Sequence, residues 1–321
     1  MSAIGGKADI PLIDAMSAFD PKRTLLLSLG RATVSLATFL FEGGQMSTQQ
    51  DVSDHYTRGD LVAAIRGGVE ALGKTIDTIT IDDLAPVDEY HIGGRQASED
   101  FLGQLDLTPE KQLLDVGCGL GGAARFVASR YGCQVTGVDL TPEFIETAKV
   151  ICGWVRLDNR ISLHLGSALA MPFADRVFDC AYMLHVGMNI VDKAKLCSEV
   201  NRVLRPSSLF GIYDVMRIGD GEIAYPVHWA ATAASSAVAT PAEYREALEK
   251  TGFTIVAERN RREFAVAQFD QLRARIAAAG GPPPLGLHLL MGGNTPDYVR
   301  NMIENVSTGR IAPVELIARK S

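Results

Sequence analysis

Leu113-Leu-Asp-Val-Gly-Cys-Gly-Leu-Gly-Gly-Ala-Ala-Arg125 indicates a buried strand, a glycine-rich turn and the start of a helix, and Gln134-Val-Thr-Gly-Val-Asp139 indicates a second strand that ends in a carboxylate. Asp139, at the tip of that strand, can accept hydrogen bonds from both hydroxyls of a ribose. Three glycines let the backbone approach a ligand where any Cβ would clash: Gly117, Gly119 and Gly121. The pattern predicts a cradle for an adenosine derivative.

The residues around this turn favour S-adenosylmethionine as that derivative. Asp115 lies two residues before the first glycine, where a carboxylate can orient the loop or hold an ammonium group but would repel a pyrophosphate. A loop at 166–173, expected to lie over an adenine, and a strand at 177–183 follow downstream. Gly117, Gly119 and Gly122 also match the dinucleotide pattern GxGxxG, which is a weak signal alone. A nicotinamide dehydrogenase and a purely structural glycine turn are therefore the alternatives.

Helical and strand patterns alternate after the first strand. Strands are expected at 113–116, 133–138, 161–165, 177–183, 209–214, 253–258 and 314–319, and helices at 121–131, 142–153 and 192–204, with a capped helix starting at Thr240. This alternation predicts a parallel sheet with helices on both faces. Ligands of such sheets bind outside the carboxyl ends of the strands, where the loops described above should meet.

The remaining segments are expected to surround that core, which comprises residues 109–261 and 310–321. Residues 46–108 should form a helical N-terminal cover, with helices at 51–73 and 96–105. Residues 262–309, with helices at 264–279 and 295–307, are long for a connection between strands and should form a lid over the site. Residues 1–45 contain an apolar run interrupted by Arg31 and make a poor signal peptide. We interpret them as an upstream extension, which is either disordered or the result of a misassigned start codon.

Composition limits the possible partners. The 321-residue chain is 47% hydrophobic and carries a net charge of −7, with no cluster of basic and aromatic residues, so a nucleic-acid partner is not expected. A membrane span is not expected either. The five cysteines form no CxxC pair and fit buried free thiols in the cytoplasm, and the six histidines lie at no metal-ligand spacing. A small-molecule substrate is expected, in a monomer or a homodimer.

The order of these pieces resembles the class I S-adenosylmethionine-dependent methyltransferases. Within this class, the chain resembles a group of small-molecule enzymes like the sarcosine/dimethylglycine N-methyltransferases. Six motifs carry this narrower resemblance: Asp88-Glu-Tyr-His-Ile-Gly-Gly-Arg95, Gly121-Gly-Ala-Ala-Arg-Phe126, Met183-Leu-His-Val-Gly-Met-Asn-Ile190, Ile212-Tyr-Asp-Val215, Tyr225-Pro-Val-His-Trp-Ala230 and Gly309-Arg310. The resemblance implies a Rossmann-like α/β fold with a mostly parallel seven-stranded sheet and an antiparallel last strand. It also implies S-adenosyl-L-homocysteine as a product.

The resemblance assigns residues to two sides of a site. The expected cofactor-binding residues are Asp115, Gly117, Gly119, Gly121, Asp139, Leu140, Ser167, Ala168 and His185. The expected acceptor-binding residues are Tyr90, His91, Arg95, Met188, Asn189, Tyr213, His228 and Trp229. In two places the chain departs from its relatives: Ser167 stands where they commonly carry an acidic residue, and His228 where they often carry proline.

Methyl transfer from a sulfonium is an in-line displacement, so the acceptor needs a free lone pair close to the methyl carbon. His185 is the expected catalytic base, although it could instead cap the following helix. Arg95 could pair with an acceptor carboxylate or serve the fold, and Trp229 could contact a cationic amine or lie in the core. We expect the nitrogen of a small amine or amino-acid derivative to be methylated. The alternatives are O- or C-methylation of a lipid, quinone or phenolic compound, and a catalytically silent cofactor-binding regulatory subunit.

Overall fold

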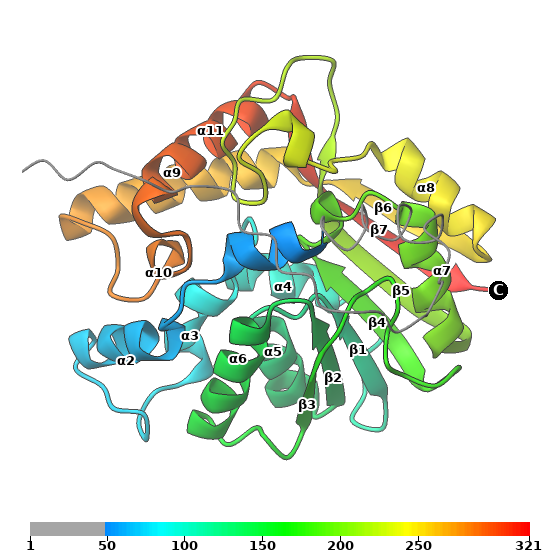
Figure 1. Ribbon diagram of the computed structural model, residues 1–321, viewed down its shortest axis with the longest axis horizontal. Helices are drawn as coiled ribbons and strands as arrows, with labels where there is room; N and C mark the ends of the chain where they lie inside the picture. Colours follow the sequence, from blue (N-terminus) through cyan, green and yellow to red (C-terminus); the bar gives the residue numbers. More distant parts are fainter. Residues whose placement is uncertain (1–48) are drawn as a thin grey trace, which may run out of the picture. The chain divides into compact units, whose positions relative to one another are not determined.

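The structure is a computed structural model that describes residues 49–321, so the expected extension at 1–45 lies outside the described residues. Seven strands form one sheet in the order β3-β2-β1-β4-β5-β7-β6 (Figure 1). Their bounds are β1 Gln112–Val116, β2 Gln134–Asp139, β3 Ile161–Leu165, β4 Phe178–Leu184, β5 Leu204–Arg217, β6 Phe253–Asn260 and β7 Ile311–Lys320. β7 runs antiparallel to both β5 and β6, while β1 to β5 pair in parallel. The predicted fold class is confirmed.

Side chains that alternate along β1 divide the core into two layers. Leu113 packs with the face covered by α4 (Gly94–Leu102), α5 (Gly122–Tyr131) and α6 (Pro142–Trp154). Leu114 packs with the opposite face, covered by α7 (Lys193–Val203) and α8 (Pro241–Lys250). Both leucines are fully buried, as expected for a parallel strand with helices on both faces. α8 begins at the predicted cap, where Thr240 and Glu243 form a capping box.

β5 is much longer than the predicted strand at 209–214. It begins at Leu204, which pairs with Phe178 of β4, and extends to Arg217, which pairs with Ile311 of β7. The hydrophobic pattern marked only the segment that is buried between both neighbours. At one end the added residues 215–217 pair with β7, and at the other end Leu204 pairs with β4; a local pattern reveals neither pairing.

The predicted helix at 51–73 is wrong, because the chain is helical at 49–56 and again in α2 (Leu61–Ala71), with a break at 57–60. Gly59, at φ +101°, lies in this break. A further helix, α3 (Ile81–Asp88), starts at Thr80 with a capping box and was not predicted. α4 starts at Gly94 rather than 96, after the left-handed Gly93, and ends at Leu102.

The segment between β6 and β7 contains α9 (Arg262–Ala279), α10 (Leu287–Met291) and α11 (Thr295–Ser307). α10 packs against α2 and α3, and Leu285, Leu290 and Met291 share a hydrophobic cluster with Leu61 and Ile65 of α2. This insertion therefore supports the helices of the N-terminal cover, and its role as a lid stays a prediction. Within residues 49–321, no helix combines the length and apolar character that crossing a bilayer requires.

Candidate active site

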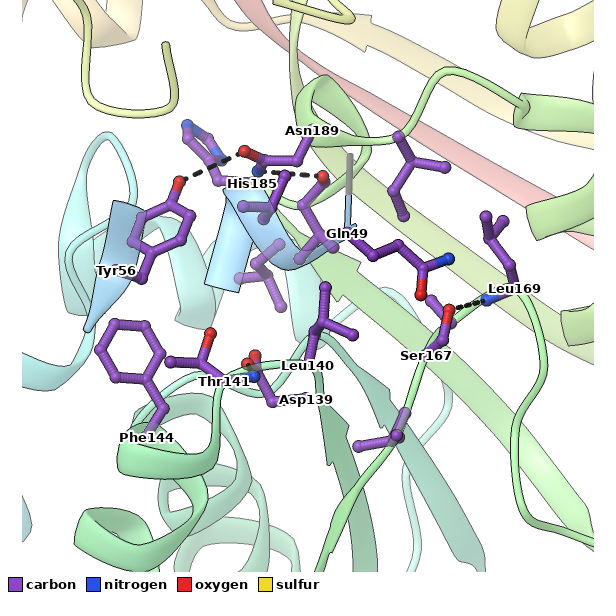
Figure 2. Close-up of a pocket in the computed structure, with 18 of the residues that line it drawn as sticks. Gln49, Tyr56, Asp139, Leu140, Thr141, Phe144, Ser167, Leu169, His185 and Asn189 are labelled. Atoms are coloured by element: carbon purple, nitrogen blue, oxygen red, sulfur yellow. Dashed lines mark hydrogen bonds between the residues drawn. The ribbon is translucent and has the colours of Figure 1, made fainter. Parts of the chain in front are cut away.

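A cavity of about 580 Å³ lies beyond the carboxyl ends of β1, β2 and β4. Figure 2 shows Gln49 and Tyr56 of helix 49–56 on one side of it, and Asp139, Thr141 and Phe144 on the other. The wall also includes Gly117, Leu140, the segment 166–169, and residues 184–186 and 189–192 at and after the end of β4. The predicted loops therefore meet at one place, as the parallel sheet requires.

The glycine turn has the backbone conformation that the sequence predicts. Gly117, Gly119 and Gly121 lie at φ values of +71°, +52° and +77°, a region that other residues rarely adopt. A Cβ on Gly117 would lie 2.4 Å from Cγ2 of Val186, across the cavity wall. The turn is tied to β2 because the backbone N–H groups of Gly117 and Cys118 both donate to the carbonyl of Val138. The space that a Cβ would take at Gly117 and Gly119 is filled by Val186 and Tyr90, so the turn packs closely against the cavity wall.

Asp139 ends β2 and holds the turn from its other side. One carboxylate oxygen accepts from the N–H of Gly119 at 2.9 Å, and the other accepts from the N–H of Thr141 at 2.9 Å. Each oxygen of a carboxylate has a second lone pair, so both can still accept from the hydroxyls of a ribose. Burial raises the pKa of Asp139. The side chain thus organises the loop and presents acceptors to the cavity.

Asp115 faces a smaller hollow of about 30 Å³, which it shares with Asp88, His91 and Cys118. The carboxylate is buried, and one of its oxygens has no hydrogen-bond partner among the described residues. Burial raises the pKa of Asp115 to about 8. A buried oxygen without a partner is costly, and an ammonium group would satisfy it. Asp115 therefore fits the amino group of S-adenosylmethionine.

The segment after β3 carries Ser167 and Ala168 into the wall beside Leu140. The hydroxyl oxygen of Ser167 accepts from the N–H of Leu169 at 3.1 Å, as Figure 2 shows. The serine thus fixes its own loop, and its hydroxyl hydrogen remains free to donate. An adenine ring nitrogen can accept from this hydroxyl, which the acidic residue of the relatives could not offer when ionised.

His185 follows β4 at φ +54°, and both of its ring nitrogens have partners. Nδ1 lies 3.3 Å from the carbonyl of Tyr213, and the N–H of Ile92 donates to Nε2 at 3.3 Å. A carbonyl only accepts and an N–H only donates, so the ring is neutral with its proton on Nδ1. Burial holds the pKa of His185 well below its ordinary value. The Nε2 lone pair that a base would need is therefore already in use.

The structure separates the predicted acceptor residues into two sets. Tyr90, His91 and Asn189 line the cavity or the adjoining hollow. Nδ2 of Asn189 donates to the carbonyl of Val186 at 3.2 Å. The other four residues apart from Arg95 lie outside the cavity wall: Met188, Tyr213 and Trp229 are buried, and His228 is half-buried. The hydroxyl of Tyr213 donates to the carbonyl of Ile92 at 2.8 Å, and Nε1 of Trp229 donates to Ser236 at 2.9 Å. These side chains support the wall from behind.

Arg95 also serves the fold in this structure. Its guanidinium donates to Glu89 at 2.5 Å, to Asp82 at 2.6 Å and to the carbonyl of Ile81 at 3.3 Å, and it lies over the ring of Phe126. Glu89 is buried, so it needs this cation. The predicted pairing of Arg95 with an acceptor carboxylate is not what the structure shows. Glu89 and Arg95 lie six residues apart across a turn, so their spacing in the sequence did not reveal this ion pair.

Several wall residues were not predicted. Gln49, Val52 and Tyr56 come from helix 49–56, and Phe144 comes from α6. The ring centroids of Tyr56 and Phe144 lie 5.7 Å apart, and those of Tyr90 and Phe144 lie 6.4 Å apart. In the sequence these aromatic residues look like members of ordinary apolar helix faces. Only their convergence on one cavity distinguishes them.

The interior confirms the expectation for the cysteines and contains an ion pair that was not predicted. All five cysteines are free and buried. Arg125 of α5 forms a buried ion pair with Asp88, at the entrance to the hollow of Asp115. Neither Asp88 nor Arg125 was singled out as a charged pair, because they lie 37 residues apart. Within residues 49–321, no cluster of histidine, cysteine and acidic side chains is suited to hold a metal ion.

Comparisons with known proteins agree with this geometry. Residues 114–212 match the family model described as a methyltransferase domain. The chain is 36% identical over 98 residues to the probable chloroplastic tocopherol O-methyltransferase of Oryza sativa subsp. japonica, a match that covers 30% of this chain and 27% of that protein. It is 31% identical over 121 residues to the glycine/sarcosine/dimethylglycine N-methyltransferase of Actinopolyspora halophila, covering 38% and 21% of the two chains.

Among solved structures, the fold is similar to that of a putative sarcosine dimethylglycine methyltransferase from Galdieria sulphuraria. The TM-score is 0.59 at 21% identity, over 70% of this chain and 86% of that one. The family match, the curated relatives and the fold together confirm the resemblance to the S-adenosylmethionine-dependent methyltransferases. The matched segments span less than a third of the length of the two curated relatives, which act on different acceptor atoms.

Proposed function

We propose that this protein transfers the methyl group of S-adenosylmethionine to a small organic acceptor, preferably at the nitrogen of an amine. The carrying observation is that one cavity joins the glycine turn and Asp139 to a wall of aromatic side chains. That wall, which we call the aromatic wall, consists of Tyr56, Tyr90 and Phe144. A donor cradle that opens onto such a wall supports transfer between two molecules bound side by side.

The donor side is proposed to use the residues that the sequence predicts. Asp115 would hold the amino group, the turn at Gly117, Gly119 and Gly121 would follow the amino-acid chain, and Asp139 would accept from the ribose hydroxyls. Leu140, Ser167 and Ala168 would surround the adenine. When bound, S-adenosylmethionine supplies an electrophilic methyl group on a positively charged sulfur.

The acceptor side is proposed to exclude water and to keep an amine neutral. Burial against aromatic and aliphatic side chains disfavours the ammonium form, which has no lone pair to share. The hydroxyl of Tyr56 lies 3.5 Å from Oδ1 of Asn189, so these two groups lie side by side in the wall, where both can orient an acceptor (Figure 2). Burial raises the pKa of Tyr56, which therefore remains a neutral hydrogen-bond donor.

His185 is proposed to position the wall more than to take up a proton. A base role would require Nε2 to release the N–H of Ile92, and the low pKa makes the ring a poor partner for an ammonium proton. We therefore infer that an amine acceptor enters in its neutral form. The carbon–nitrogen bond then forms as the carbon–sulfur bond breaks, and the proton of the new ammonium leaves to water.

A second candidate is O- or C-methylation of a phenolic, quinone or lipid acceptor. The aromatic wall favours an apolar acceptor, and the ion pairs of Arg95 leave it unavailable for the carboxylate of an amino acid. A curated relative named as a tocopherol O-methyltransferase supports this candidate as well. A third reading, a catalytically silent subunit that binds the cofactor, predicts binding without turnover.

The test is release of S-adenosylhomocysteine by the full chain with three sets of acceptors. The first set is glycine, sarcosine and dimethylglycine, the second is small amines without a carboxylate, and the third is phenols and quinones. Release with either amine set supports the lead, and release with the third set alone supports the second candidate. Tight binding of S-adenosylhomocysteine without turnover in any set favours the silent subunit.

A further inference from the structure

The break between helix 49–56 and α2 is held by a single carboxylate from α6. The backbone N–H groups of three residues in or next to the break donate to Glu143: Arg58, Gly59 at 2.7 Å and Leu61 at 3.1 Å. Hydrogen bonds to a charged acceptor contribute more than neutral ones. The side chain of Arg58 also donates to the carbonyl of Leu290 in α10. The break is therefore tied to two neighbouring elements.

This carboxylate replaces a cap that α2 lacks. Asp60 occupies the N-cap position, but its side chain makes no capping hydrogen bond. The first N–H groups of a helix need acceptors, and a negative charge there interacts favourably with the helix dipole. Glu143 supplies both from outside the helix. Without it, these three N–H groups would have only water as a partner.

The location of Glu143 connects this tie to the donor site. Glu143 follows Thr141, which lines the cavity and donates its N–H to Asp139, and it precedes Phe144 of the aromatic wall. Helix 49–56, on the other side of the tie, places Gln49, Val52 and Tyr56 in the same cavity wall (Figure 2). Because these three side chains form part of the wall, movement of the helix would open this side of the cavity. Residues 57–60 offer the place where it can move, because they are not helical.

We propose that Glu143 is a positioning residue that holds helix 49–56 closed over the cavity, and that residues 57–60 are the hinge on which this helix opens to exchange donor and product. The inference rests on the proposed function only in requiring that the cavity binds the donor. It assigns to the first turn of α6 two tasks, which are shaping the cavity and fastening its cover. Release of the three N–H groups from Glu143 opens the cover.

The test measures the dissociation rate of S-adenosylhomocysteine from the full chain by stopped-flow fluorescence. Glu143→Ala is expected to raise this rate about tenfold, the equivalent of 1.4 kcal/mol. Glu143→Gln keeps one acceptor oxygen and should show a smaller rise. Glu146→Ala, which removes an exposed carboxylate from the next turn of the same helix, is the matched control and should leave the rate unchanged.

A second variant covers the case in which Glu143→Ala does not fold. Gly59→Ala keeps every partner of Glu143 and meets no atom within 4 Å, but it strains a hinge residue at φ +101°; it should also speed dissociation. Unchanged rates in Glu143→Gln and Gly59→Ala, or an equal rise in Glu146→Ala, would overturn the role of Glu143. Failure of the unaltered protein to bind S-adenosylhomocysteine would instead overturn the donor site itself.

Discussion

The donor side of the cavity and its acceptor side are built by different means. The donor side uses strand ends and their turns, so glycine conformations and the carboxylate of Asp139 place its groups directly. The acceptor side uses side chains from separate helices and loops, including Tyr56, Tyr90, Phe144 and Asn189. Its shape therefore depends on how those elements pack. The comparison teaches that donor binding should fail through single local changes, and acceptor binding through loss of distant supports.

Substitution of Asp139 and of His185, which follow β2 and β4 at the cavity, should give the largest effect. Asp139→Ala is expected to weaken binding of S-adenosylhomocysteine at least about 100-fold, because it removes the ribose acceptor and the anchors of Gly119 and Thr141. His185→Ala should spare binding and lower turnover. Calorimetric titration of both variants checks this division. Equal loss of binding in the two would show that the sides are not separate.

Arg95 tests whether the acceptor side depends on distant supports. Arg95→Ala should lower the free energy of unfolding by about 3 kcal/mol, because Glu89 would remain buried without its cation. Urea denaturation measures the change. The control is Arg300→Ala, which breaks an exposed ion pair with Asp297 and should cost under about 0.5 kcal/mol. Unchanged stability with weaker binding of carboxylate acceptors alone would restore the predicted acceptor role.

Gly117 tests how tightly the donor side is fitted. Gly117→Ala should weaken binding of S-adenosylhomocysteine about tenfold or more, because the new Cβ would meet Val186 and the residue lies at φ +71°. The matched control is Gly153→Ala in α6, where no atom lies within 4 Å. There, better helix propensity should stabilise the protein by about 0.5–1 kcal/mol. Similar binding by both variants would contradict the close fit of the turn.

The smallest effect expected is a proton released on binding. Burial raises the pKa of Asp115 to about 8 from an ordinary value of 3.8, so the folded protein holds this proton between those values and its stability falls as pH rises through them. An ammonium ligand favours the ionised carboxylate. Binding at pH 6.5 should therefore release about one proton, and affinity should rise towards pH 8. Calorimetry in buffers of different ionisation enthalpy detects it, and Asp115→Asn should release none.

The sequence was most informative where a feature is local. β3 and α11 have the predicted bounds, and β1, β2, α5 and α6 differ from prediction by one or two residues. It was least informative where a feature joins distant segments. The break at 57–60 depends on Glu143, about eighty residues away, and an apolar stripe running through it predicted one continuous helix. The long β5 likewise depends on pairing with β4 at one end and with β7 at the other.

The same distinction applies within the candidate site. His185, Tyr90, His91 and Asn189 were singled out from motifs and do line the cavity or its hollow, whereas Met188, Tyr213, His228 and Trp229 lie behind the wall. A motif shows which segment approaches a site, but the packing of that segment decides which of its side chains point inward. The hydrogen bonds that fix the tautomer of His185 come from Tyr213 and Ile92, and no spacing rule predicts them.

By itself, the sequence determined the fold class, the order of the strands along the chain, the glycine turn and the carboxylate at the end of β2. It could do so because strand burial and left-handed glycine conformations are properties of short segments. Only the tertiary structure decided that Arg95 pairs with Glu89, that Tyr56 and Phe144 belong to the aromatic wall, and that Glu143 accepts hydrogen bonds from the break after helix 49–56. These depend on the partners that each side chain meets, which packing brings together from distant parts of the chain.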